Sequence, residues 1–254
     1  MGSSAALRLI RSSVNANHNL PSSSGSSASG NGGGLYGSSL TLTLNGTTIA
    51  NNEIRADGPT NDATANGGGI DLIGPSSMKA TNSTIAGNVA HGQGSPTGSF
   101  IGYASGAGAS APSISLTNAT VAGNRATASA HFPNSQGGGL KADDVTLRAS
   151  ILAGNSAKSG PDCFATTATS NGHNLIRHNG KCLASQKTSD KIGVSPQLRP
   201  LRDNSGPTKT MAIRATSPAF NAIPPASCAV GVDQRGVHRP QGKRCDIGAF
   251  ERRV

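Results

Sequence analysis

Apolar and polar residues along the chain follow a long repeat. An aliphatic residue, two small residues and an asparagine recur five times, with spacings of 35, 36, 36 and 31 residues between successive asparagines. Ten and eight residues before each asparagine the side chains are mostly apolar, with a polar residue between them. This alternation of period two predicts a short strand with one buried face in every repeat. The five copies end at Asn17, Asn52, Asn88, Asn124 and Asn155.

Two further features complete each repeat. One is a run of three glycines followed by an aliphatic residue, and the other is a polar insertion of variable length. The glycine run occurs at residues 32–35, 67–70 and 137–140 and is degraded at 106–109, while examples of the insertion are residues 21–31, 56–66 and 90–105.

Three strand-like pieces per repeat predict an all-β fold, a right-handed parallel β-helix with three short parallel sheets. In this fold Ile49, Ile85, Val121 and Leu152 stack as an interior column, and the five asparagines form a structural ladder through their side-chain amides at one corner. A helical solenoid is disfavoured because the chain has 34 glycines. Disorder is disfavoured because it would not preserve five registers of apolar alternation.

The chain carries a formal charge of +10, and that charge is unevenly placed. Residues 1–150 contain seven Lys or Arg against six Asp or Glu, whereas residues 151–254 contain fifteen against six. A basic surface attracts acidic polysaccharide, anionic lipid or nucleic acid, although it can also be solvated without a specific partner. Aromatic residues make up only 3% of the chain. Their scarcity argues against nucleic-acid stacking and against sugar-stacking platforms, so sugar contacts would rely on Asn, Ser, Thr and Arg.

The chain resembles two classes of bacterial β-helix protein. The aliphatic-x-x-Asn and glycine-aliphatic motifs are similar to repeats of polymorphic outer-membrane proteins, although Ile, Val or Leu stands here where those repeats usually have Phe. After residue 150 an ordered series of motifs occupies residues 162–163, 170–176, 195–198, 203–208, 217–222, 233–236, 239–242 and 245–251. This series resembles the choice-of-anchor Q domain of bacterial surface proteins, which implies an exported β-helix and no established activity.

The four cysteines form two local pairs, Cys163 with Cys182 and Cys228 with Cys245. Their spacings do not match a zinc site, so we predict two disulfides and an oxidising compartment. We expect coils over residues 1–206 and a loop-rich C-terminal cap over residues 207–254, in which Asp233, Arg235, Arg239, Asp246 and Glu251 pair structurally. The first coil shows no cap and the N-terminus looks truncated, which predicts end-to-end self-association or fraying.

Catalytic residues are weakly indicated. Asp143 and Asp144 stand near Lys141 and Arg148, Asp71 is expected one or two coils below, and His173 is a further candidate. Adjacent aspartates on a strand point to opposite faces, so only one of the pair would face a cleft. We therefore interpret Asp143 and Asp144 as turn residues and His173 as a corner residue, and predict no metal and no cofactor.

The sequence favours a non-enzymatic β-helix, secreted or on a bacterial cell surface, that mediates adhesion or contacts glycan. A polysaccharide lyase or glycoside hydrolase acting on acidic polysaccharide is the alternative. No apolar run approaches the roughly 20 residues of a membrane span, and no export signal is recognisable in the chain. The expected partner is a polysaccharide or another cell-surface component, with no nucleic acid.

Overall fold

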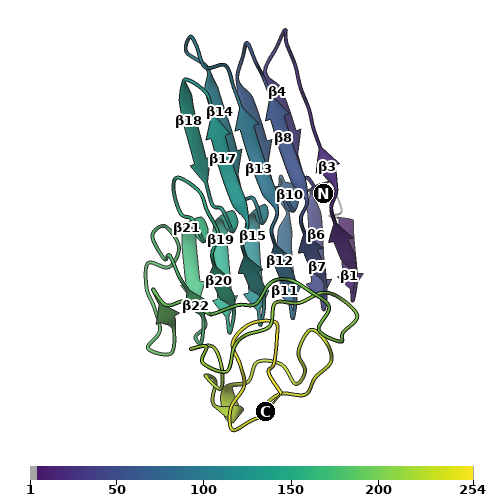
Figure 1. Ribbon diagram of the computed structural model, residues 1–254, viewed down its shortest axis with the longest axis vertical. Coiled ribbons are helices and arrows are strands. Elements are labelled where there is room, and N and C mark those ends of the chain that lie inside the picture. The colour runs from purple at the N-terminus through teal and green to yellow at the C-terminus, as the bar shows by residue number, and fades with distance from the viewer. Residues whose placement is uncertain (1–4, 254) are drawn as a thin grey trace.

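The computed structural model describes residues 5–253, and within them the chain is an all-β solenoid of parallel strands without an α-helix (Figure 1). The predicted parallel β-helix is confirmed. Each coil runs through up to four sheets, called A to D below. Neighbouring coils pair in parallel, residue for residue, so that each repeat lies on the equivalent positions of the repeat before it.

Sheets A and B form the body of the molecule. Sheet A contains both the glycine-aliphatic piece and the alternating piece of each repeat, and sheet B contains the aliphatic-x-x-Asn piece. The strands of sheet A are β1 (Ala5–Ile10), β5 (Leu35–Ser38), β6 (Leu40–Asn45), β10 (Ile70–Ile73), β11 (Ser77–Thr81), β15 (Ala109–Thr117), β19 (Leu140–Arg148) and β21 (Cys163–Ser170). Those of sheet B are β2 (Ser13–Asn15), β7 (Thr48–Ala50), β12 (Thr84–Ala86), β16 (Thr120–Ala122), β20 (Ile151–Ala153), β22 (Leu175–Ile176) and β23 (Lys191–Ile192).

The body is filled by aliphatic columns. The register places Ile49 beside Ile85, Ile85 beside Val121 and Val121 beside Leu152. All four side chains are fully buried in one core cluster. Burying an aliphatic side chain of this size contributes about 1.5–3 kcal/mol, so stacking them at every rung drives the coil to close.

The polar insertions form two sheets of their own, so the coil has four sheets where three were expected. Sheets C and D pack face to face as an arm that extends away from the body (Figure 1). Sheet C contains β3 (His18–Asn19), β8 (Glu53–Asp57), β13 (Val89–Gln93) and β17 (Arg125–Ser129), and sheet D contains β4 (Ala28–Asn31), β9 (Ala63–Asn66), β14 (Ile101–Ser105) and β18 (Phe132–Gln136).

The arm has a thin interior made of small side chains. Its buried cluster consists almost entirely of alanine, with Ile54 as the one large aliphatic side chain. Gly92 shows how closely the two layers approach, since a Cβ atom there would lie 2.1 Å from the carbonyl oxygen of Tyr103. The short distance between sheets C and D therefore leaves room mainly for alanine and glycine. The insertions accordingly keep a period-two alternation with these small residues in the buried positions.

The five repeat asparagines form a continuous hydrogen-bonded ladder. The Nδ2 of each asparagine donates to the Oδ1 of the next over 2.8–2.9 Å, from Asn17 through to Asn155. Each backbone N–H donates to the same Oδ1 atom. Asp162 ends the ladder, because its Oδ1 accepts the Nδ2 of Asn155 at 2.9 Å and its Oδ2 accepts the N–H of His178 at 2.7 Å.

The C-terminal segment lies along the side of the coils. It was expected to cover the end of the stack, but the residues that bury themselves at that end are Cys182 and Leu183, which join the body core. The segment after β23 runs back beneath the strands, where its loops appear yellow-green (Figure 1). Its contacts follow a column of threonines that faces outward from sheet B, with hydrogen bonds from Thr48 to the carbonyl of Lys209 (2.6 Å), from Thr84 to Gln234 (2.7 Å) and from the N–H of Ala249 to Thr120 (3.1 Å).

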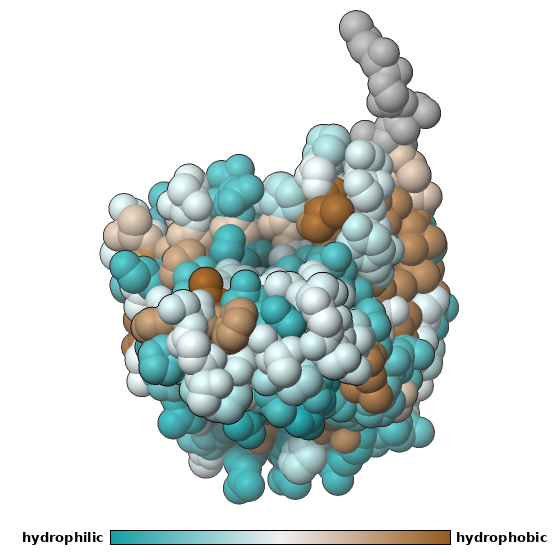
Figure 2. All heavy atoms as spheres, turned by 90° about the horizontal axis from the view of Figure 1, so that it is seen from above, coloured by the Kyte–Doolittle hydropathy of each residue, from teal (hydrophilic) through white to brown (hydrophobic). Residues whose placement is uncertain are grey.

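The first coil has an open apolar side. Leu7, Ile10 and Leu20 are 36%, 53% and 60% exposed, while Leu9 and Val14 are half-buried against the core. Hydrophobic side chains accordingly gather on the flank at this end of the stack (Figure 2). End-to-end association remains a prediction.

Candidate functional site

The residues named as catalytic candidates do not converge. Asp143 and Asp144 are both exposed on β19, where the pairing register skips Asp143, so the expected opposite orientation of the two side chains is not seen. Asp144 lies beside Thr167 of β21. His173 follows β21, beyond the pairing of Leu147 with Ser170, and therefore lies well past Asp144 along the strand.

His173 belongs to a turn that closes the later coils. Its φ is 59° and its N–H donates to the Oγ of Ser189 at 3.1 Å. Burial lowers the pKa of His173, while the nearby carboxylate of Asp190 raises it by less. Across residues 5–253, no three His, Cys, Asp or Glu side chains gather as a metal site. The geometry thus supplies neither a paired acid and base nor a cation cage at these positions.

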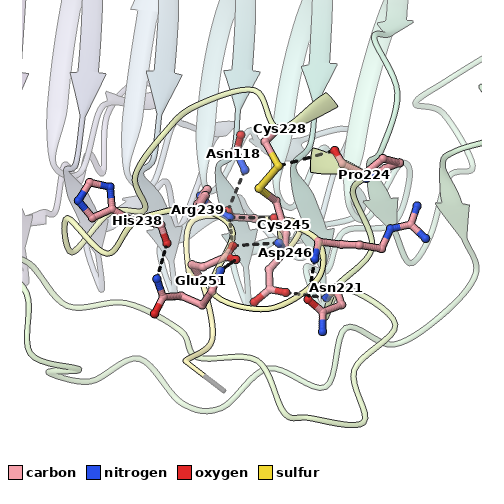
Figure 3. Close-up of a disulfide and its surroundings, with 12 residues drawn as sticks. Asn118, Asn221, Pro224, Cys228, His238, Arg239, Cys245, Asp246 and Glu251 are labelled. Carbon is pink, nitrogen blue, oxygen red and sulfur yellow. Dashed lines mark hydrogen bonds and ion pairs between the residues drawn. A yellow bond between two sulfur atoms is a disulfide. The ribbon is translucent and has the colours of Figure 1, made fainter. Parts of the chain in front are cut away.

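The C-terminal charges form a buried network beside a disulfide. Cys228 and Cys245 are bonded, as predicted (Figure 3), and Cys163 and Cys182 are bonded as well. Arg239 Nη1 donates to Glu251 Oε2 at 2.7 Å, and both side chains are at most 1% exposed. Removing either partner would leave a buried charge uncompensated.

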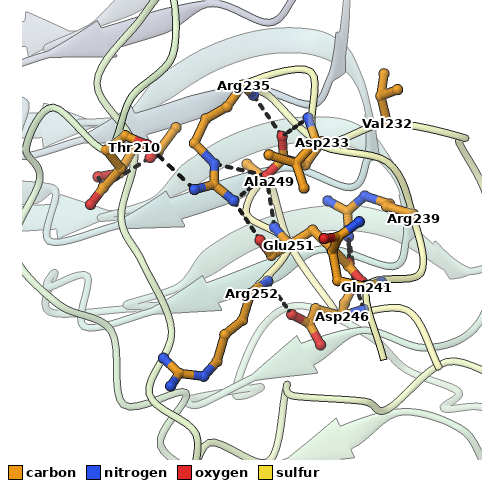
Figure 4. A network of polar contacts seen from close by, with 12 residues as sticks. Thr210, Val232, Asp233, Arg235, Arg239, Gln241, Asp246, Ala249, Glu251 and Arg252 are labelled. Atoms are coloured by element: carbon orange, nitrogen blue, oxygen red, sulfur yellow. Dashed lines mark hydrogen bonds and ion pairs between the residues drawn. The ribbon is translucent and has the colours of Figure 1, made fainter. Parts of the chain in front are cut away.

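Arg235 and Asp233 form the second half of this network (Figure 4). The guanidinium of Arg235 donates twice to Asp233 Oδ2, at 2.7 and 2.9 Å, and lies 3.6 Å from the ring centroid of Phe250. Burial raises the pKa of Asp246 to about 6, against the lowering effect of backbone N–H donation from Arg252 and Asn221. Each of these carboxylates accepts hydrogen bonds from backbone N–H groups or arginines of the same C-terminal segment. These bonds stabilise the conformation of a segment that has almost no regular secondary structure.

Burial of these acids leaves a basic surface. Of the six acidic residues after residue 150, Asp162, Asp233, Asp246 and Glu251 are at most 3% exposed. Of the fifteen basic residues in the same part of the chain, only Arg235 and Arg239 have side chains that are paired and buried. Thirteen exposed or half-exposed cations therefore face two accessible carboxylates, those of Asp190 and Asp203. The exposed excess of basic over acidic side chains is therefore larger in proportion than the fifteen against six counted in the sequence.

Lys158, one of these exposed cations, lines a hollow at the end of the arm together with the exposed Arg125 of the fourth repeat. The fifth repeat has no arm, so the interior between β17 and β18 opens into a hollow of about 580 Å³. Arg125 and Lys158 line it together with Thr127, Asn134 and small side chains, and no carboxylate contributes to the lining. Pro133 also lies on this open edge, where it removes a backbone donor, and Lys158 Nζ donates to its carbonyl at 3.2 Å. Proline and lysine at the edge of a sheet disfavour pairing with a further strand. We therefore expect no additional strand to cover the hollow.

The junction of arm and body forms a re-entrant corner. In each coil a glycine with positive φ turns the chain from sheet D into sheet A, and at Gly67 (φ 64°) a Cβ atom would lie 2.5 Å from the Cβ of Asp71. Asp71 alternates with the core residues Ile70 and Leu72 and so lies on the outer face of sheet A, yet it is only 1% exposed. A residue on an outer face is covered in this way only if the neighbouring surface folds over it.

Two parallel columns of side chains meet at this corner, which we call the corner face. Burial raises the pKa of Asp71, and a hydrogen bond from Ser110 lowers it by less. Asn31 lies against Asp71, and turning its amide so that the nitrogen faces acceptors lets it donate to Asp71 Oδ2 over 3.2 Å. Ser105 Oγ donates to Asn66 Oδ1 at 2.8 Å. The column on sheet D is Asn31, Asn66, Ser105 and Gln136, and the column on sheet A is Tyr36, Asp71, Ser110, Lys141 and Phe164.

Sequence reasoning found Asp71 but not its surroundings. The corner combines residues about 35 positions apart, and each wall comes from a different sheet. The outward positions of the insertions carried the only signal, as polar or aromatic residues that alternate with alanine or glycine. Comparison of the chain with protein-family models, curated proteins and solved structures gave no match.

Proposed function

We propose that this protein is a secreted or cell-surface β-helix without enzymatic activity, whose role is to contact acidic polysaccharide. The observation that supports it is the exposed basic excess after residue 150, where thirteen cations stand against two accessible carboxylates. The two disulfides indicate an extracellular or otherwise oxidising environment. No helix among residues 5–253 is long and apolar enough to cross a membrane.

The rigid scaffold suits contact with a polymer. Successive coils rise by about 4.8 Å, so side chains on the outer faces form fixed rows that can meet a long chain at many points. Exposed cations that are not neutralised by neighbouring acids raise the local concentration of a polyanion, and each added contact strengthens the total binding. Such attraction weakens with ionic strength, because exposed charges are screened over about 8 Å at 0.15 M salt.

Affinity electrophoresis of the full chain tests the proposal. The gels contain polygalacturonate, alginate or neutral dextran, at 0.05 and 0.15 M salt. We expect retardation by at least one acidic polymer at both salt concentrations and none by dextran. Arg125→Gln combined with Lys158→Gln should weaken the retardation, whereas Lys79→Gln, which removes an exposed lysine from the outer face of sheet A, should change it little.

Equal migration in acidic and neutral polymer would refute the proposed function. The same polysaccharides are then incubated with the protein and assayed for new reducing ends and for unsaturated sugar. Release of either product would establish the alternative, a lyase or hydrolase.

A further inference from the structure

Three aromatic side chains lie on or beside the corner face. The chain has two tyrosines and five phenylalanines. Tyr36 is 52% exposed on the outer face of sheet A, and Phe164 lies on the same column four rungs further along. On the facing wall, Tyr103 projects outward from sheet D beside the corner column, two residues before Ser105, and its neighbour Ala104 is buried. Both tyrosines and one phenylalanine therefore line one surface.

The same surface offers groups that bind hydroxyls. Asn66 and Gln136 are half-buried on sheet D, and the Tyr103 hydroxyl donates to Gln136 Oε1 at 3.2 Å. Side-chain amides present a donor and an acceptor side by side, which matches vicinal hydroxyl groups. The hydrogen bond of the Tyr103 hydroxyl to the Gln136 amide fixes the orientation of the Tyr103 ring, so this part of the wall is preorganised before any ligand arrives.

One cation lies within this surface. Lys141 alternates with the core residues Leu140 and Ala142 and therefore faces outward, with its Nζ 5.7 Å from the centroid of the Phe164 ring. Asp71, the only carboxylate in the two columns, is covered by its neighbours. Within the two columns the accessible charge is therefore positive, although the exposed Asp143 lies two residues beyond Lys141 on β19.

We propose that the corner face is a polysaccharide-binding site that takes a chain containing carboxylated sugars along the solenoid axis. Aromatic rings stack on the faces of sugar rings, the Asn and Gln amides bond to ring hydroxyls, and the Lys141 ammonium pairs with a carboxylate. This inference rests on the proposed function and adds to it a specific surface with non-electrostatic contacts. Scarcity of aromatic residues in the whole chain does not argue against stacking where three of those residues line one face.

The dimensions of the corner fit a linear polymer. The column from Tyr36 to Phe164 crosses five rungs, which span about 19 Å at the inter-strand spacing of 4.8 Å. The sheet D wall accompanies four of those five rungs, because the fifth repeat has no arm, and a chain can lie in the corner with several sugar residues in contact. Chains of two or three sugars would contact only part of the site, and we expect affinity to rise with oligosaccharide length.

The test compares two substitutions on the corner face with two matched substitutions on the outer face of sheet A. Tyr36→Ala and Lys141→Gln remove an aromatic and a cationic contact. Ile73→Ala and Lys79→Gln are the controls, since Ile73 is 41% exposed and Lys79 is exposed, and neither belongs to the corner columns. Binding is measured by isothermal titration with size-defined oligogalacturonates and oligoalginates, and the fold is checked by circular dichroism.

We expect Tyr36→Ala to weaken binding roughly tenfold at every salt concentration, because the contact of an uncharged ring with the sugar that covers it is not screened by salt. Lys141→Gln should weaken it mainly at low salt, and the two controls should bind as wild type. If both corner variants bind as wild type while wild type binds acidic oligosaccharide, the corner site is wrong and the basic-surface function stands. If wild type binds no acidic oligosaccharide or polymer, both proposals fail together.

Discussion

Substitution of Asn88 by alanine tests whether the asparagine ladder holds the coils together. Asn88 lies in the middle of the ladder and is fully buried. Its Oδ1 accepts the N–H of Asn52 at 3.0 Å and the Nδ2 of Asn52 at 2.9 Å, and its own Nδ2 donates to Ile49 and Asn124. Asn88→Ala removes these four bonds in one step.

The expected cost follows from the groups that lose their partners. Asn52 is 0% exposed, so water cannot replace Asn88 as the acceptor of its backbone N–H and of one amide hydrogen. Each stranded buried donor costs about 1–3 kcal/mol, which gives about 4 kcal/mol for the two. Asn17→Ala provides the matched comparison, because Asn17 is exposed and Asn52 Oδ1 still accepts its backbone N–H at 3.1 Å. We expect about 1 kcal/mol or less for that variant.

Urea denaturation followed by circular dichroism gives the free energy of unfolding of both variants and wild type. The comparison uses midpoints and slopes measured under one set of conditions, since a solenoid can unfold in parts. An Asn88→Ala variant that loses no more stability than Asn17→Ala would refute the reasoning, because buried and exposed ends of the ladder would then contribute equally.

Three further predictions concern the turn, the disulfide and pH. Gly67→Ala should destabilise the fold by at least about 2 kcal/mol, since φ is 64° and the new Cβ would lie 2.2 Å from the Ile70 carbonyl oxygen, whereas Gly231→Ala, with nothing within 4 Å, should be neutral in the same urea assay. Replacing Cys163 and Cys182 by serine together should cost about 3 kcal/mol, measured against wild type with and without reductant. The pKa of Asp246 is raised to about 6, so between its unfolded and native pKa values the native state keeps a proton that the unfolded chain has lost; the free energy of unfolding should fall by about 2 kcal/mol between pH 4 and 6, and Asp246→Asn should flatten that slope.

The body of the fold could be predicted because its pattern is carried by large aliphatic residues at fixed spacing. Ile49, Ile85 and Val121 stand in identical local motifs, and stacking is the arrangement that buries all of them. The arm follows the same alternation, but its buried positions hold Ala63, Ala65 and other small residues that are equally common in loops. Small residues give a weak hydrophobic signal, so its strands were not recognised as sheets.

The position of the C-terminal segment depends on contacts that no local pattern reveals. Gln234 bonds to Thr84 across 150 residues and to Thr48 across 186. Its Nε2 also donates to Thr208, within the segment itself, at 2.8 Å. A sequence shows that such a glutamine is polar and shows nothing of the surface that satisfies it. The corner face was missed for the same reason, since its two walls meet only after the glycine turns are folded.

The alternation that builds the solenoid also separates stability from recognition. Ala104 points into the arm and Tyr103 points out of it, although they are neighbours on one strand. On sheet A the buried Leu140 and the outward Lys141 stand in the same relation. The interior positions are constrained by close packing, while the outward positions make few contacts with the core and are free to carry any side chain that a ligand requires. Rows of outward residues over several coils therefore form a binding surface whose chemistry can vary without altering the columns that hold the coils together, and the corner is where two such rows face each other.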